Sequence, residues 1–204
     1  MANKKITDLS PATTPLSGAE LFETVQSGAS AKVAAADIAN SATSIPYNSL
    51  TGRAYLSAIS TSDQTGSTSA GTAVIIPTTV INSGVTMTSN GSALTRITFA
   101  AAGTYAIMPS LQMANSNTSN HNVTIWFKKN GTDIANSATI INVPKVADGG
   151  NTFFQIVFYE QVTAGQYIEI YWQPTNVAVT LDAIPATATA PAAPSVILTT
   201  ERIA

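Results

Sequence analysis

The acidic side chains and the single histidine are the residues of this chain that could carry out chemistry. His121 is the only histidine among 204 residues, so a Ser-His-acid site would have to use it. It follows the polar loop NSNTSN, and no nucleophile motif accompanies it. We therefore expect His121 to lie at the surface or to cap a turn.

Three carboxylates, Glu160, Glu169 and Asp182, offer a second kind of chemistry. Two carboxylates at a suitable separation are enough to hydrolyse a glycosidic bond, but the sequence does not fix that separation. The chain is short for a polysaccharide-cleaving spike, and it lacks a long repetitive β-helix. We expect no enzymatic activity, with a glycan-hydrolysing spike enzyme as an alternative.

Metal and cofactor sites are not indicated either. Asp148-Gly149-Gly150-Asn151 has oxygen ligands for calcium but lacks the alternating acids of a calcium loop, so it predicts a turn. With no cysteine, the chain has neither a disulfide framework nor thiolate metal ligands. We expect no metal and no cofactor.

The composition narrows the class of partner. Nine Lys and Arg residues are scattered along the chain, so the basic patch of a nucleic-acid-binding protein is absent. The opening MANKKITDLSPATT has no apolar signal region, and no window approaches the roughly 18 apolar residues that span a bilayer. We expect no nucleic acid, no export signal and no membrane insertion.

The elements that position these residues fall into two parts. In residues 1–50, LFETVQ and AKVA flank the small residues Ser27 to Ser30, which predicts a hairpin. Such a hairpin is marginal by itself, so we expect it to dock onto something else. The polar stretch NSATSIPYNSLT then predicts a linker. Residues 51–204 form the second domain.

Short alternating runs between Gly, Asn and Pro predict an all-β sandwich for this second domain. In Gly103 to Ala114 one face is apolar, and Pro109 indicates an edge or a bulge because it cannot donate to a ladder. Asn130-Gly131 predicts a tight turn between His121–Lys129 and a return strand at Thr132–Val143. IPATATAPAAP predicts a long loop before the closing strand.

Large aromatic groups also occur on the sides of the strands that should face water. A monomeric sandwich is polar there, so these rings favour a subunit interface, although single rings at the surface or over the sandwich ends are also normal. The candidate interface residues are Trp126, Phe153, Tyr159, Tyr167 and Tyr171.

The order of several runs carries a family resemblance. TRITFAAAGTYAI, WFKKNGT, VTAGQYIEIYW and SVILTTERI, between about Thr79 and Arg202, resemble the jelly-roll heads of tumour necrosis factor and the complement-type collagens. The resemblance implies a jelly roll of about ten strands, which forms a homotrimer through aromatic-rich faces.

The opening segment carries a second resemblance. Ile6-Thr7-Asp8-Leu9, Gly18-Ala19-Glu20-Leu21, Val25-Gln26 and Ala36-Asp37-Ile38 are similar to the amino-terminal segments of tailed-phage fibre and tail proteins, with Thr24 where that series has Val. The resemblance implies a segment that docks on other virion proteins. The candidate docking residues are Ile6, Asp8, Leu9, Leu21, Phe22, Val25, Val33 and Ile38.

Together these patterns predict a homotrimeric bacteriophage tail fibre or similar appendage, located in the virion and assembled in the host cytoplasm. Its head would attach to a glycan or protein of the host surface. The candidate contact residues in loops are Asn117, Asn120, His121, Asp148, Asn151 and Asn176. A capsid decoration or head-fibre protein that stabilises the shell is an alternative, because the same fold suits both uses.

Overall fold

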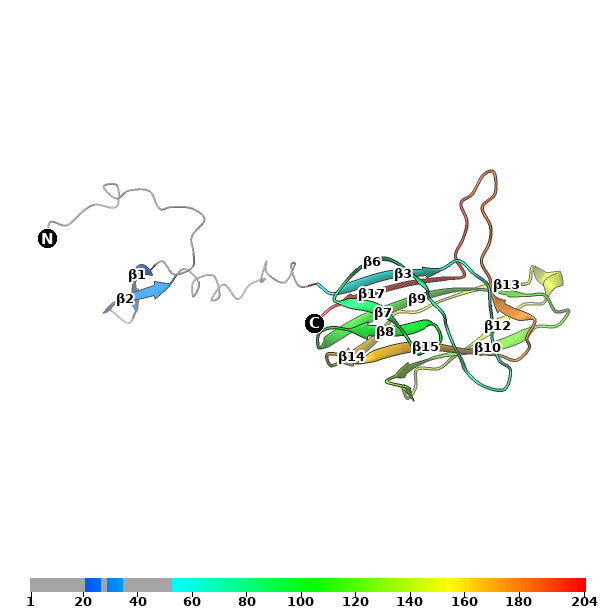
Figure 1. The fold of residues 1–204 in the computed structure, drawn as a ribbon, viewed down its shortest axis with the longest axis horizontal. Helices are drawn as coiled ribbons and strands as arrows, with labels where there is room; N and C mark the ends of the chain where they lie inside the picture. The colour runs from blue at the N-terminus through cyan, green and yellow to red at the C-terminus, as the bar shows by residue number, and fades with distance from the viewer. Residues whose placement is uncertain (1–20, 27–28, 35–52) are drawn as a thin grey trace. The chain divides into compact units, whose positions relative to one another are not determined.

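The computed structural model describes residues 21–26, 29–34 and 53–204 (Figure 1). The chain divides into two compact units, Met1–Gly52 and Arg53–Ala204. In the first unit, β1 (Leu21–Gln26) and β2 (Ala29–Ala34) form an antiparallel hairpin with Phe22 opposite Val33. The strands therefore approach the turn more closely than predicted, because Ala29 and Ser30 belong to β2.

The candidate docking residues all belong to this first unit. Ile6, Asp8, Leu9 and Ile38 lie outside the described residues, whereas Leu21, Phe22 and Val25 lie on β1 and Val33 lies on β2. Their role in docking stays a prediction.

Two antiparallel sheets make up the second unit, and we name each after its central strand. The β15 sheet has seven strands: β5 (Thr72–Ala73), β7 (Val85–Ser89), β8 (Leu94–Phe99), β10 (His121–Lys129), β11 (Thr132–Asp133), β12 (Thr139–Val143) and β15 (Tyr167–Pro174). The β9 sheet has eight strands: β3 (Tyr55–Ser60), β4 (Gln64–Thr65), β6 (Thr78–Ser83), β9 (Gly103–Asn115), β13 (Asn151–Gln155), β14 (Phe158–Val162), β16 (Val179–Leu181) and β17 (Val196–Arg202). One 3₁₀ turn, Val146–Asp148, precedes β13.

The chain passes repeatedly from one sheet to the other, and this connectivity is that of a jelly roll. It changes sheet at β4–β5, β5–β6, β6–β7, β8–β9, β9–β10, β12–β13, β14–β15 and β15–β16, so strands distant in sequence become neighbours. The closing strand β17 lies between β3 and β9, as Figure 1 shows. The predicted all-β sandwich is confirmed. No helix in the described ranges is long and apolar enough to cross a membrane.

The inner faces of the two sheets form the core, as strict alternation requires. On β10, Val123, Ile125 and Phe127 are buried, while Thr124 and Trp126 between them are partly exposed. On the runs whose faces the alternation indicates, Ile156 and Phe158 are only partly buried, and the other inward residues are buried: Tyr105, Ile107, Leu111, Met113, Val123, Phe154, Val162, Ile168, Ile170 and Trp172. Periodicity alone therefore identified the inner face of each of these strands.

Pro109 lies in the middle of the β9 sheet, so the prediction of an edge or a bulge is wrong. On one side of β9, β14 pairs with Gly103–Ile107 and β13 pairs with Ser110–Ala114. The backbone amides of Thr104 and Gln112 point to the opposite side, toward Ala204 and Ser195. Backbone direction alternates along a strand, so the nitrogen of Pro109 points to the side of β13 and β14. It lies at the gap between these two strands, where no carbonyl of a paired strand needs an amide proton.

The turn at Asn130-Gly131 is confirmed by left-handed φ angles of 50° and 82°. The single return strand predicted over Thr132–Val143 is wrong, because β11 ends at Asp133 and β12 begins at Thr139. Between them Ser137 is buried, and its hydroxyl accepts the Phe127 amide proton at 3.1 Å. This side chain replaces the ladder partner that a continuous strand would have supplied.

The inner and outer positions of β10 should differ in their tolerance to truncation. Ile125→Ala should lower the free energy of unfolding by about 2–5 kcal/mol, because it opens a cavity in the core. The adjacent, outward-facing change Thr124→Ala should alter it by less than about 0.5 kcal/mol. Urea unfolding at matched protein concentrations measures both, and equal losses would contradict this assignment of faces.

Candidate functional site

Buried Asn115, at the end of β9, organises the loops at one end of the sandwich. Its side chain is 2% exposed. The amide nitrogen Nδ2 donates to the carbonyls of Ser119, Val143 and Pro144 at 2.9, 3.3 and 3.0 Å. The oxygen Oδ1 accepts the Asn117 backbone proton at 2.9 Å. One side chain therefore joins the loop after β9 to the loop after β12.

Further hydrogen bonds unite three loops into a loop platform, residues 115–122, 144–151 and 174–178. The Lys145 amide donates to Asn120 Oδ1 at 2.8 Å. The Ser116 amide donates to the Ala178 carbonyl at 3.1 Å. Asn122 and Thr175 bond reciprocally, since the Asn122 amide donates to Thr175 Oγ1 and the Thr175 amide donates to the Asn122 carbonyl. The loops are thus fixed in shape by their own polar groups.

The six candidate contact residues all lie in this loop platform, so the structure brings them together. Several of them also hold the loops in place. The Oδ1 atoms of Asn117 and Asn176 accept the backbone protons of Ser119 and Ala178, and Asn151 Nδ2 donates to the Gly149 carbonyl. Asn120, Asp148 and Asn151 are the exposed members, whereas His121 is half-buried. Their contact with a ligand stays a prediction.

The loop platform is largely polar and carries little charge, although Val146 and Val177 are exposed in it. Lys145 Nζ lies 3.8 Å from the Asp148 carboxylate. No cluster of three metal-ligating side chains occurs among residues 21–26, 29–34 and 53–204. The exposed amides, hydroxyls and carbonyls suit hydrogen bonding to a polar, uncharged surface.

The candidate interface residues divide between the two outer faces of the sandwich. Trp126, Tyr167 and Tyr171 lie on the outer side of the β15 sheet, with Trp126 opposite Tyr171 in register. Phe153 and Tyr159 lie on the outer side of the β9 sheet, on β13 and β14. Because the two faces are on opposite sides of the core, the five residues do not form one surface.

Charged side chains from the same chain already cover the rings on the β15 sheet. The Arg96 guanidinium carbon lies 4.3 Å from the Tyr167 ring centroid, and Lys128 Nζ lies 4.4 Å from that of Tyr171. These are cation–π contacts. Trp126 Nε1 donates to Asp133 Oδ1 at 2.7 Å. Alternation alone did not reveal these partners, which lie on three different strands.

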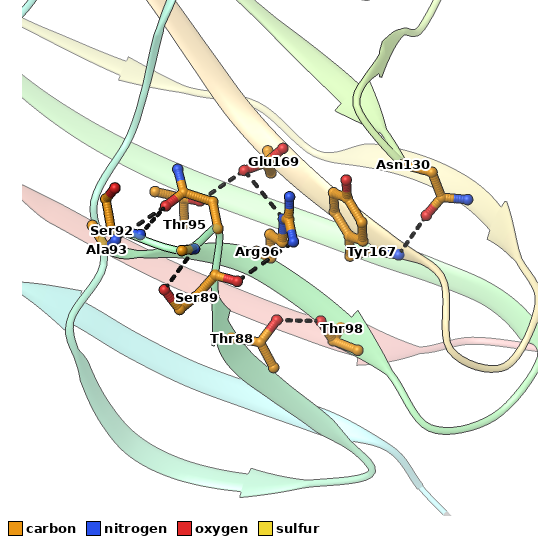
Figure 2. Close-up of polar contacts among 12 residues, drawn as sticks. Thr88, Ser89, Ser92, Ala93, Thr95, Arg96, Thr98, Asn130, Tyr167 and Glu169 are labelled. Atoms are coloured by element: carbon orange, nitrogen blue, oxygen red, sulfur yellow. Dashed lines mark hydrogen bonds and ion pairs between the residues drawn. The ribbon is translucent and has the colours of Figure 1, made fainter.

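A buried carboxylate lies beneath this row of rings and cations. Glu169 is 3% exposed, and its Oε1 accepts the Thr95 hydroxyl proton at 2.7 Å and lies 3.8 Å from Arg96 Nε (Figure 2). A buried charge is tolerated only where it is paired and hydrogen-bonded, as this one is. Glu169 therefore stabilises the outer side of the β15 sheet.

The outer side of the β9 sheet is different, because its large aromatic rings are exposed. We name these rings, together with two exposed isoleucines, the apolar face: Tyr55 (41% exposed), Ile81 (58%), Phe153 (56%), Tyr159 (59%) and Ile197 (41%). Registers place Tyr159 and Tyr55 in one cross-strand row, through Ala106 and Glu201. In this row the charged Glu201 lies between Ala106 and Tyr55. Several large exposed apolar side chains on one sheet face are typical of an interaction site.

The three acids considered for glycoside hydrolysis are not gathered at one site. Glu160 is opposite Tyr105 on β9, whereas Asp182 follows Leu181, which is opposite Met113. From Tyr105 to Met113 the strand rises about 26 Å, well beyond the roughly 5–10 Å that a carboxylate pair requires. Glu160 forms an ion pair with Lys129 at 2.6 Å, and Glu169 is buried as described above.

Asp182 has a neighbouring carboxylate, Asp63. Asp63 Oδ1 accepts the Ala183 backbone proton at 2.8 Å. Burial raises the pKa of Asp182 above its ordinary value of 3.8, and the negative charge of Asp63 raises this pKa further. Folding therefore disfavours the ionised form of Asp182 relative to an unfolded chain.

No protein-family model matches the chain, and no curated protein sequence matches it. Matching solved structures include three crystal structures of murine APRIL, at pH 8.5, 5.0 and 8.0, which have a jelly-roll fold of the tumour necrosis factor family. They are 9–10% identical to this chain, with a TM-score of 0.46. The similarity covers 74% of this chain and 99% of the APRIL chains.

Asn115→Ala should loosen the loop platform. It leaves buried backbone groups without partners, so the free energy of unfolding should fall by about 1–3 kcal/mol or more. Amide hydrogen exchange at Asn117 and Lys145 should become faster. Asn142→Ala is the matched control, because it removes one exposed bond to Asn122. If both variants behaved alike, the central role of Asn115 would be refuted.

Asp182→Asn should raise the melting temperature at pH 7. Since the pKa of Asp182 is raised on folding, its ionisation opposes folding as the pH rises from 3.8 through the raised pKa. The gain of the variant should therefore be greatest above that window and disappear below it. Thermal melts from pH 3 to 8 measure this difference. Asp148→Asn, which removes an exposed partner of Lys145, should give no such gain.

Proposed function

We propose that this protein is a structural and binding component of a bacteriophage virion, in which the first unit docks on other virion proteins. The jelly-roll head assembles into a homotrimer and displays the loop platform to the host surface. The opening segment supports the docking role through its resemblance to phage fibre and tail proteins. The head supports the assembly role through its apolar face.

The proposal of self-association rests on the exposure of the apolar face. Its five residues belong to five different strands and are 41–59% exposed in a single chain. Burying such side chains between subunits removes apolar area from water, at about 25 cal/mol for each Å². On the β15 sheet, by contrast, the rings already have intrachain partners. We therefore assign the subunit interface to the β9 sheet.

The loop platform supports attachment. Rigid loops at the end of a sandwich can present hydrogen-bonding groups without a large loss of entropy on binding. Its low charge suits a neutral glycan or the polar surface of a protein. The alternative function, capsid decoration, would use the same self-association. It differs in that the head would lie on the capsid shell and not face the host surface.

A charge placed on the apolar face should weaken self-association. Ile81→Asp should raise the dissociation constant of the trimer at least tenfold, because the carboxylate would be desolvated in the interface. Ile140→Asp is the matched control, since Ile140 is 69% exposed on β12 of the other sheet. Sedimentation velocity over a dilution series of the full-length chain measures both. A trimer disrupted by Ile140→Asp alone would refute the assignment of the interface.

The location in the virion can be tested by immunogold labelling of phage particles with antibodies against residues 53–204. Label at the tail or its fibres is expected for an attachment appendage. Label over the shell would instead establish the decoration function, and particles without label would refute a virion component altogether.

A further inference from the structure

A preformed arm, residues 184–193, extends from the sandwich between β16 and β17. Its two legs are joined by reciprocal hydrogen bonds, since the amides of Ile184 and Ala193 each donate to the other's carbonyl at 2.9 Å. At the tip the Thr187 amide donates to the Ala190 carbonyl at 2.9 Å, and Thr187 Oγ1 accepts the Ala190 amide proton at 3.0 Å. Figure 1 shows the arm, coloured orange to red, projecting clear of both sheets.

The arm is apolar, although it is exposed to water. Its sequence, IPATATAPAA, contains no charged residue, and residues 184–192 are all exposed. Exposed hairpins are ordinarily polar, with turn residues such as Asn, Asp and Gly. Small side chains and prolines lose little conformational freedom on binding, so an arm of this composition suits close packing against another surface.

The base of the arm is continuous with the apolar face. Both legs leave the β9 sheet at Gln112, where pairing changes from β17 to β16. The Asp182 amide donates to the Gln112 carbonyl at 3.0 Å, and Gln112 Nε2 donates to the Pro194 carbonyl at 2.6 Å. Gln112 is opposite Phe153 of the apolar face. Ile184 in the arm is 46% exposed, and Ile197 just beyond it is 41% exposed.

We propose that the arm of each copy packs on the apolar face of a second copy of this chain. This inference rests on the proposed self-association and names the segment that completes the interface. Within one chain the arm and the face both stay exposed, so neither covers the other. In a closed ring each copy contributes one arm and receives one, so that no copy is left with an arm or a face unpartnered.

Site-specific crosslinking tests the contact directly, because the chain has no cysteine of its own. A full-length Ala188→Cys chain is co-expressed with a full-length Thr199→Cys chain that carries a tag of different mass. Ala188 lies at the arm tip, and Thr199 is exposed on β17 within the β9 sheet. A short bismaleimide should crosslink the two different chains. Thr124→Cys, on the outer side of the β15 sheet, replaces Thr199→Cys as the control and should give at least tenfold less product.

Deletion of Pro185–Ala192, with an Asn-Gly turn joining Ile184 to Ala193, tests the energetic role of the arm. The trimer dissociation constant should rise at least tenfold while the circular dichroism of the head is unchanged. A stable trimer that neither crosslinks through Thr199→Cys nor weakens on deletion would refute the arm contact and leave self-association intact. A full-length chain that is monomeric at all concentrations would refute both the arm contact and self-association. Equal crosslinking to the control position would refute a specific site for the arm.

Discussion

The central strand β9 is the constraint on which the rest of the head depends. Its inward side chains, among them Tyr105, Ile107 and Leu111, are fully buried. Its two edges pair with four other strands, β13 and β14 on one side and β16 and β17 on the other. A strand with this many partners fixes several loops at once. The arm leaves the sheet where the partner of β9 changes from β17 to β16. At the end of β9, Asn115 joins the loops of the loop platform.

The two outer faces of the sandwich solve the problem of exposed aromatic groups in different ways. On the β15 sheet, Arg96 and Lys128 cover tyrosine rings, and buried Glu169 compensates the charge of Arg96. On the β9 sheet no such partners cover Phe153 or Tyr159, which are more than half exposed. Both faces carry large rings, so they differ in whether charged side chains cover those rings and not in residue type. It is the reason that we assign self-association to one face.

The polar and apolar surfaces of the head have separate physical roles. The loop platform is built from amides and hydroxyls whose hydrogen bonds set its shape, so its specificity would come from directional contacts. The apolar face and the arm would contribute affinity through buried area, which is not directional. A head that combines the two can assemble by one surface and recognise by another.

The sequence by itself determined the all-β class, the inner face of the clearest alternating strands such as β10 and β15, the Asn130-Gly131 turn and the loop before β17. These features are local, because alternation and turn propensity act between residues close in the chain. Only the tertiary structure decided which sheet each strand joins, and so separated Trp126 from Phe153. It also decided the registers on β9 that separate Glu160 from Asp182. It also placed Pro109 at a break between two partner strands and gave Tyr167 and Tyr171 their cations. Those outcomes depend on pairing between distant segments, which periodicity within one strand does not encode.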